Sequence, residues 1–342
     1  MLNGHGDDTY KYKDIRTNFS SNVYSHFDHS GLFAYLAERL SRVVNYPEPT
    51  PVTLEKALAK SHGVKASQVM VTNGATEAIY LIAQAFRGSG SCIMQPTFSE
   101  YADACHLHAH SVRGCSALLD SGDADPGSLF WLCNPNNPTG EVIPKASIMR
   151  MIEERPDVLF VIDASYAPFA GEAQPTAAEM AACGNALMLH SMTKEYAIPG
   201  LRLGYITGCE ALLKKIGECR MPWSVNQLAQ DAGLYLLSHK DDYQLDVPLL
   251  LSERRRVAEA LQATGGIEVH SSDTHILLCR IKRGTASELK ERLAERYGLL
   301  IRDASNFAGL SQAHFRIAVQ TPAENDVLIQ ALSDVIGEYS IS

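Results

Sequence analysis

The sequence has no long apolar run, no excess of basic residues and no close pair of cysteines. Its 342 residues carry 30 lysines and arginines against 39 aspartates and glutamates, a formal net charge of -9. This balance argues against nonspecific nucleic-acid binding, because neutralising a phosphate backbone needs a basic face. The first residues also lack the basic and then apolar layout of a signal peptide. We therefore expect a cytoplasmic protein with neither a nucleic-acid nor a membrane partner.

The eight cysteines are scattered, without a C-x-x-C spacing, and several lie in apolar runs such as LFWLCN. This usage favours buried free thiols over disulfides or zinc ligands.

Short apolar runs alternate with helical periodicity over residues 55–207. Such alternation predicts an α/β fold with a mostly parallel sheet covered by helices on both faces. After residue 210 long helical patterns appear, and strands and helices then mix. We expect a polar N-terminal arm over 1–30, a large domain over 31–225 and a smaller α+β domain over 226–342.

Ligands bind at the carboxyl ends of strands in open α/β sheets, so polar groups at predicted strand ends are candidate site residues. The segment VTNGATEA ends one strand at Gly74 and begins a helix. Backbone N–H groups of Gly74, Ala75 and Thr76 are suited to a phosphate at the positive end of that helix. An ordinary N-cap by Asn73 or Thr76 is an equally good interpretation of this segment alone.

Two further strand ends carry polar side chains. CNPNNPTG forms a rigid turn that presents Asn137. LFVIDASY buries Asp163, with Tyr166 three residues later. A buried carboxylate is costly unless it is paired, so Asp163 needs a cationic partner. The functional interpretation is that Asp163 pairs with a protonated heterocycle. The alternative is that it is only a helix N-cap.

HSMTKEYAIPGLRLGY adds Ser191, Thr193, Lys194 and Arg202. A lysine in isolation is most often an exposed charge. A Ser-x-x-Lys hydrolase would also need S-D-N and K-T-G motifs, which are absent. In HFRIAVQT, Arg316 alternates with apolar residues and suits either a surface ion pair or a bidentate carboxylate clamp.

Together these groups match the requirements of pyridoxal phosphate: an anion cradle, an acid for the ring nitrogen, a tyrosine, a Schiff-base lysine and two arginines. With these motifs in this order, the sequence resembles the class I/II aminotransferases, pyridoxal-phosphate enzymes of fold type I. The resemblance implies a large domain built on a mostly parallel sheet of seven strands, a small C-terminal α+β domain and a homodimer with shared active sites. It also implies catalytic roles for Lys194, Asp163 and Tyr166. The cofactor contacts that it implies are Gly74, Ala75, Thr76, Phe98, Asn137, Asp163, Tyr166, Ser191, Thr193, Lys194 and Arg202, with Tyr46 reaching the neighbouring subunit's cofactor.

Within this family, the segment YAIPGLRLGY followed by MPWSVNQLAQ is most similar to the threonine-phosphate decarboxylase branch. Histidinol-phosphate aminotransferase or another amino-acid transaminase is the alternative. Both branches act on small phosphorylated amino acids or amines. By this resemblance Arg316, Arg302, Asn137, His5 and Asn22 bind the substrate. The usual His-Gly-Gly reads His5-Gly6-Asp7 here, which adds a negative charge near the expected phosphate site.

Two other function classes compete with this interpretation. A nucleotide-binding oxidoreductase or methyltransferase would need a G-x-G-x-x-G after its first strand, and that motif is missing. A non-catalytic regulator would need a DNA-binding domain, for which the short polar arm is too small.

Overall fold

The larger of the two main sheets has seven strands, and most of them are parallel. The computed structural model describes residues 7–116 and 124–341. Within them, seven strands form this sheet in the order β2, β8, β7, β6, β5, β3 and β4. The strand bounds are Val69–Thr72 (β2), Gly90–Met94 (β3), Ser111–Cys115 (β4), Leu129–Cys133 (β5), Leu159–Asp163 (β6), Ala186–Ser191 (β7) and Gly204–Gly208 (β8). Strands β3 to β7 are mutually parallel and β8 is antiparallel to both neighbours, which confirms the mostly parallel sheet.

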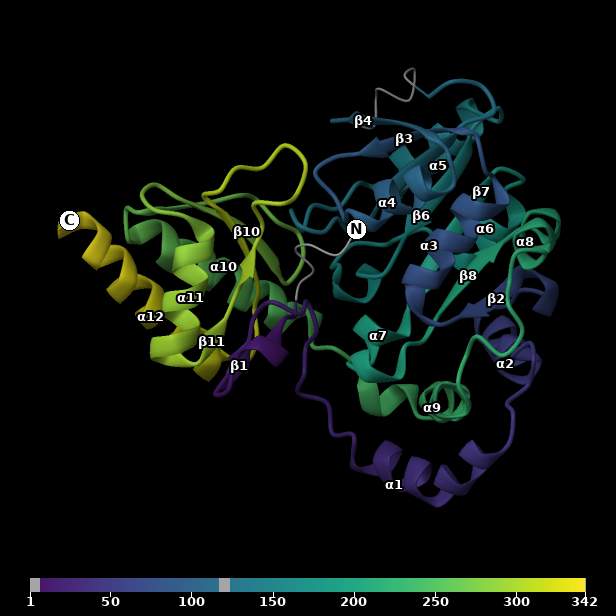
Figure 1. Ribbon diagram of the computed structural model, residues 1–342, viewed down its shortest axis with the longest axis horizontal. Helices are drawn as coiled ribbons and strands as arrows, with labels where there is room; N and C mark the ends of the chain where they lie inside the picture. Colours follow the sequence, from purple (N-terminus) through teal and green to yellow (C-terminus); the bar gives the residue numbers. More distant parts are fainter. Residues whose placement is uncertain (1–6, 117–123, 342) are drawn as a thin grey trace.

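Helices cover both faces of this sheet (Figure 1). Adjacent residues of β5 show this, because Phe130 packs in a cluster with Ile148 whereas Trp131 belongs to the cluster of Ile79. A strand that is buried on both faces explains the continuous apolar run LFWLC. The helices of this part of the chain are α1 (Ser30–Arg39), α2 (Val52–His62), α3 (Gly74–Ala85), α4 (Glu100–Leu107), α5 (Lys145–Glu154), α6 (Ala177–Ala182), α7 (Met192–Glu195), α8 (Glu210–Gly217) and α9 (Gln227–Ser238).

The small C-terminal domain holds an antiparallel sheet in the order β12, β13, β10 and β9. Its strands are β9 (Ile267–Val269), β10 (Ile276–Ile281), β12 (Arg302–Asp303) and β13 (His314–Ala318), and its helices are α10 (Val247–Ala263), α11 (Ala286–Tyr297) and α12 (Pro322–Ile341).

The N-terminal arm is attached to the small domain. Its strand β1 (Thr17–Asn18) pairs in parallel with β11 (Leu299–Leu300), and the two lie side by side in Figure 1. Asp8 adds an ion pair with Lys290, with an Oδ2 to Nζ distance of 2.6 Å. The arm is therefore held in place by the same domain that carries Arg316.

The packing of helix α9 bears on where the large domain ends. Helix α9 contacts α1 and α2. Its Ala229 and Leu236 share an apolar cluster with Val71 of β2 and Tyr205 of β8. We propose that the large domain extends through α9 and that the small domain begins near α10.

Two expectations from composition can be compared with this fold. The eight cysteines are free; five of them are buried and three are partly exposed. Among the described residues, no helix has both the length and the apolarity needed to cross a membrane.

Candidate active site

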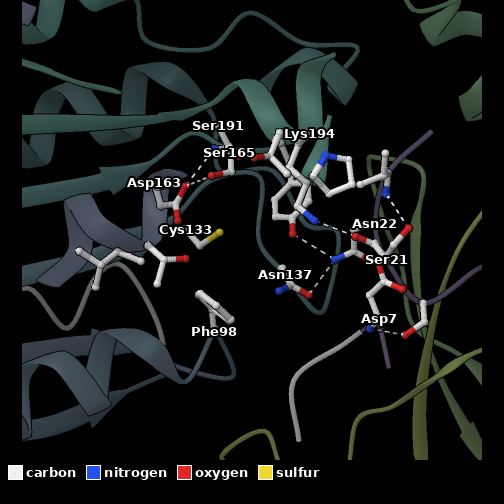
Figure 2. Close-up of a pocket in the computed structure, with 18 of the residues that line it drawn as sticks. Asp7, Ser21, Asn22, Phe98, Cys133, Asn137, Asp163, Ser165, Ser191 and Lys194 are labelled. Carbon is white, nitrogen blue, oxygen red and sulfur yellow. Dashed lines mark hydrogen bonds between the residues drawn. The ribbon is translucent and has the colours of Figure 1, made fainter. Parts of the chain in front are cut away.

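A cavity of about 290 Å³ opens where the carboxyl edge of the large sheet meets the arm and the small domain. Figure 2 shows residues of the arm and of the large domain converging on it, and Arg316 adds a residue of the small domain. Its lining residues are Asp7, Ser20, Ser21, Asn22, Val23, Ala75, Thr76, Ile79, Phe98, Tyr101, Cys133, Asn137, Asp163, Ser165, Tyr166, Ser191, Thr193, Lys194, Pro199, Arg202 and Arg316. Most of the residues singled out from sequence are thus brought together in one place.

The first turn of α3 forms an anion cradle against Arg202. Asn73 stands at the N-cap position but its side chain makes no capping hydrogen bond, and its N–H donates to Glu77 Oε2. Gly74 has φ of +79°, and a Cβ there would lie 2.7 Å from Nη2 of Arg202. Arg202 Nη1 donates to Thr193 Oγ1 at 3.5 Å. Uncapped backbone N–H groups beside a guanidinium suit a phosphate dianion.

Asp163 is buried and held by neutral donors. Its Oδ2 accepts a hydrogen bond from the Tyr101 hydroxyl at 2.6 Å. Its Oδ1 accepts from the Ser165 hydroxyl at 2.5 Å and the Ser165 N–H at 2.9 Å. In the described part of the chain no cationic side chain forms an ion pair with Asp163, so no protein group supplies the cationic partner that its burial calls for. A buried carboxylate that still lines a cavity suits a cationic group of a ligand.

Lys194 is not the exposed charge that isolated lysines usually are. It lies on α7 directly after β7, and its Nζ donates to the carbonyl of Ser21 at 2.7 Å. Burial, and then the positive charge of Arg316, lower the pKa of Lys194 to about 7. A large fraction of this amine is therefore neutral at physiological pH, which a nucleophile or proton carrier requires.

Asn22, Asn137 and Tyr166 form a connected wall on the arm side of Lys194. Asn22 Nδ2 donates to the Tyr166 hydroxyl at 3.0 Å and lies 3.4 Å from Asn137 Oδ1. Burial raises the pKa of the Tyr166 hydroxyl well above its usual value. Tyr166 is thus a neutral hydrogen-bonding group.

Arg316 is buried without a carboxylate partner among the described residues. Its guanidinium donates to Asn137 Oδ1 and to the carbonyl of Ser20. Burial lowers its pKa to about 9. Arg302 pairs with Arg316 in the β12–β13 register, and both line a smaller cavity of about 130 Å³. Phe98 and Asn137 line both cavities, which are therefore adjacent.

Three predicted residues in the described part of the chain, Gly74, Tyr46 and Arg302, are not among those that line the main cavity. Tyr46 has an exposed fraction of 83% and packs on Trp223, so it does not reach the cavity of its own subunit. Arg302 lines only the smaller cavity. His5 lies outside the described residues.

Sequence reasoning missed Tyr101, Ser165, Ser21 and Cys133. Tyr101 stacks on Trp131 with ring centroids 5.8 Å apart while bonding Asp163. Phe98 lies just before α4 and Tyr101 in its first turn, and the two rings contact edge to face with centroids 5.9 Å apart, so the closeness of Tyr101 to Phe98 in FSEY was the available signal. Ser21 contributes its carbonyl, for which no side-chain signal exists.

Comparison with known proteins assigns this constellation to a family. The model of aminotransferase class I and II matches residues 14–332. The chain belongs to that family. Members of this family depend on pyridoxal phosphate, and they are decarboxylases or transaminases.

Individual relatives fall into both branches that the sequence suggested. The crystal structure of L-threonine-O-3-phosphate decarboxylase from Porphyromonas gingivalis is 40% identical, with a TM-score of 0.91 over 94% of this chain and 99% of that one. The threonine-phosphate decarboxylase of Salmonella typhimurium is 31% identical over 88% of this chain and 86% of its own. A histidinol-phosphate aminotransferase of Desulfitobacterium hafniense is 29% identical, covering 85% and 84%.

Proposed function

We propose that this chain is a pyridoxal-phosphate enzyme that decarboxylates a small phosphorylated amino acid, with threonine O-phosphate as the favoured substrate. The observation that carries the substrate class is the pair of buried arginines, Arg302 and Arg316, in adjacent cavities. Two cations that face each other favour a ligand with two anionic groups. The identities to the two decarboxylases support the same branch.

The residues of the cavity fit the cofactor. The α3 turn, Ser191, Thr193 and Arg202 would hold its phosphate, and Phe98 would stack on its ring. Asp163 would face the ring nitrogen, since the hydrogen bonds from Tyr101 and Ser165 orient this carboxylate and leave it without a cationic side chain as partner. Asn137 and Tyr166 lie beside Lys194, where they would contact the ring hydroxyl.

Bound pyridoxal phosphate supplies a conjugated ring that accepts an electron pair from the substrate. The chain decides which bond is cleaved by how it orients the substrate. Arg316 and Asn137 bind the carboxylate from the side of the small domain, while Arg302 and Asn22 bind the phosphate. Lys194, with its pKa near 7, is placed to carry a proton to or from the substrate Cα.

A second function has specific support from the same arginine pair. 2-Oxoglutarate carries two carboxylates, so the pair also fits the acceptor of a transaminase. The histidinol-phosphate aminotransferase relative favours this alternative.

One experiment separates the two functions. The holoenzyme is incubated with threonine O-phosphate, and separately with histidinol phosphate plus 2-oxoglutarate. We expect release of carbon dioxide in the first reaction. Formation of glutamate in the second, with no carbon dioxide in the first, would replace the decarboxylase by the transaminase.

We further propose a homodimer in which Tyr46 completes the partner's cofactor site. Large apolar side chains around Tyr46 are exposed on the single chain, including Val44 at 82%, Phe33 at 64% and Met221 at 73%. Several large apolar side chains left exposed are typical of a surface that a partner covers.

A further inference from the structure

An acidic side chain of the arm faces the cavity that holds Lys194. Asp7 lines this cavity together with Ser20, Ser21 and Lys194. In Figure 2 it lies on the arm side, across the cavity from Phe98. None of the roles given above for the cofactor or the substrate anions uses this carboxylate.

Asp7 is fixed in position by its neighbours. Its backbone has φ of +63°, a conformation that side-chain-bearing residues adopt only when their surroundings impose it. Its N–H donates to Ser20 Oγ at 3.3 Å. Thr9 Oγ1 and Asn18 Nδ2 both donate to Oδ1, at 2.6 and 2.7 Å. Among the described residues no donor reaches Oδ2, which is therefore available to a ligand.

Charged side chains of both signs act on Lys194. Arg316 and Arg202 disfavour positive charge at Nζ, whereas Asp7 and Asp163 favour it. Asp163 is already bonded by Tyr101 and Ser165. Asp7 and the Ser21 carbonyl are therefore acceptors that line the cavity near the amine, and Arg316 lies next to them because it donates to the neighbouring Ser20 carbonyl.

We propose that Asp7 docks the α-ammonium group of the incoming amino-acid substrate, with its Oδ2 accepting a hydrogen bond from that group while Arg316 binds the carboxylate. This inference rests on the proposed amino-acid substrate and assigns the one charged group of such a substrate that had no partner. Asp7 is a binding residue that orients the amine toward Lys194. The same carboxylate stabilises positive charge on Lys194.

Ligand binding tests the contact with the amine. Inhibition constants or KM values are measured for threonine O-phosphate and for 3-phosphooxybutanoate, its analogue without the amino group. Asp7→Asn keeps the Oδ1 acceptor for Thr9 and Asn18, and it is expected to weaken binding of the amine about five- to tenfold while leaving the analogue unchanged. Asp7→Gly, which relieves the positive φ, should show the same selectivity. Asp14→Asn is the matched control, because it removes an exposed carboxylate of the same arm that does not line the cavity.

A spectroscopic titration tests the electrostatic part without any substrate. The visible absorbance of the holoenzyme changes when the linkage between Lys194 and the cofactor loses its proton. Loss of the Asp7 charge should lower that apparent pKa by about half a unit, and Asp14→Asn should not change it. Equal weakening of both ligands, or an unchanged titration in Asp7→Asn, would overturn the proposal. If the wild-type enzyme binds neither ligand, the phosphorylated substrate is wrong, and the titration still decides the role of Asp7.

Discussion

Arg302 and Arg316 lie directly opposite each other on the antiparallel strands β12 and β13. Residues opposite each other in such a ladder have their side chains on one face of the sheet, and like charges in these positions repel. Both arginines are buried, and the charge of Arg302 contributes to the lowered pKa of Arg316. This arrangement is unfavourable in an empty site and favourable once anions bind, so it is typical of a binding site rather than of a structural pair.

The two arginines should have separable effects on substrate binding. Arg316→Gln is expected to raise KM for any amino-acid substrate about 100-fold, because it removes a buried charge-assisted clamp. Arg302→Gln should instead lower the preference for threonine O-phosphate over threonine about tenfold or more. Steady-state kinetics with both amino acids measures the two effects.

Arg280→Gln is the control for these variants. Arg280 lies on the neighbouring strand β10 but is half exposed and pairs with Glu268. The Arg280→Gln variant should change neither the KM for amino-acid substrates nor the preference for threonine O-phosphate over threonine. A uniform loss of activity toward both amino acids in Arg302→Gln would contradict its assignment to the phosphate.

The lowered pKa of Lys194 predicts that this residue destabilises the cofactor-free protein at low pH. The unfolded lysine has its ordinary pKa near 10.4 and the folded one about 7, so the unfolded state binds more protons between these values. Folding stability of the wild-type apoprotein should therefore rise as the pH increases from about 7 to 10. Lys194→Met should be more stable than wild type by about 1 to 3 kcal/mol at pH 6, and the difference should vanish above pH 10. Urea unfolding at several pH values measures this difference. A constant difference across that range would show that the amine is not desolvated.

Tyr101 should act on catalysis through Asp163. Asp163→Asn is expected to lower kcat by several orders of magnitude, because the residue loses the charge that faces the ring nitrogen. Tyr101→Phe keeps the stacking on Trp131 but removes one donor to the carboxylate, so we expect a loss of about tenfold. Rapid-mix or steady-state assays with the cofactor at saturation separate this effect from weaker cofactor binding. Wild-type turnover in Asp163→Asn would exclude the ring-nitrogen role.

Local motifs explain which parts of the site the sequence predicted. Asp163 is the last residue of a buried strand, and Lys194 and Asn137 follow such strands within a few residues, so an apolar run and a polar residue near its end identify them. The cavity wall formed by Ser21 depends on a contact across 173 residues, and the Tyr101–Asp163 bond spans 62. No periodicity encodes such contacts, since the packing of the arm and of α4 against the sheet creates them. The proposed shift of the domain boundary from 226 to a point after α9 has the same origin, because a helical pattern does not reveal which elements the helix packs against.

Mixed dimers test whether Tyr46 serves the neighbouring subunit. Tyr46→Ala and Lys194→Met should each be impaired alone. When the two proteins are unfolded and refolded together, each mixed dimer contains one site with an intact Lys194 and a partner's Tyr46, so about a quarter of wild-type activity should return. Refolding either variant alone gives the baseline. No recovery, in a sample whose mass confirms mixed dimers, would contradict the shared site.

Gly74 should be required for cofactor affinity beyond its backbone conformation. Gly74 and Gly88 share a φ of +79°, but a Cβ at Gly88 meets nothing within 4 Å, whereas one at Gly74 meets the Arg202 guanidinium at 2.7 Å. Both alanine variants should lose about 1 kcal/mol of stability from the strained backbone. Only Gly74→Ala should also displace Arg202, and we expect the dissociation constant for pyridoxal phosphate to rise at least tenfold, measured by titration of the apoprotein. Equal affinities in the two variants would mean that Arg202 is not needed in the cradle, because the strain common to both would then account for the whole effect.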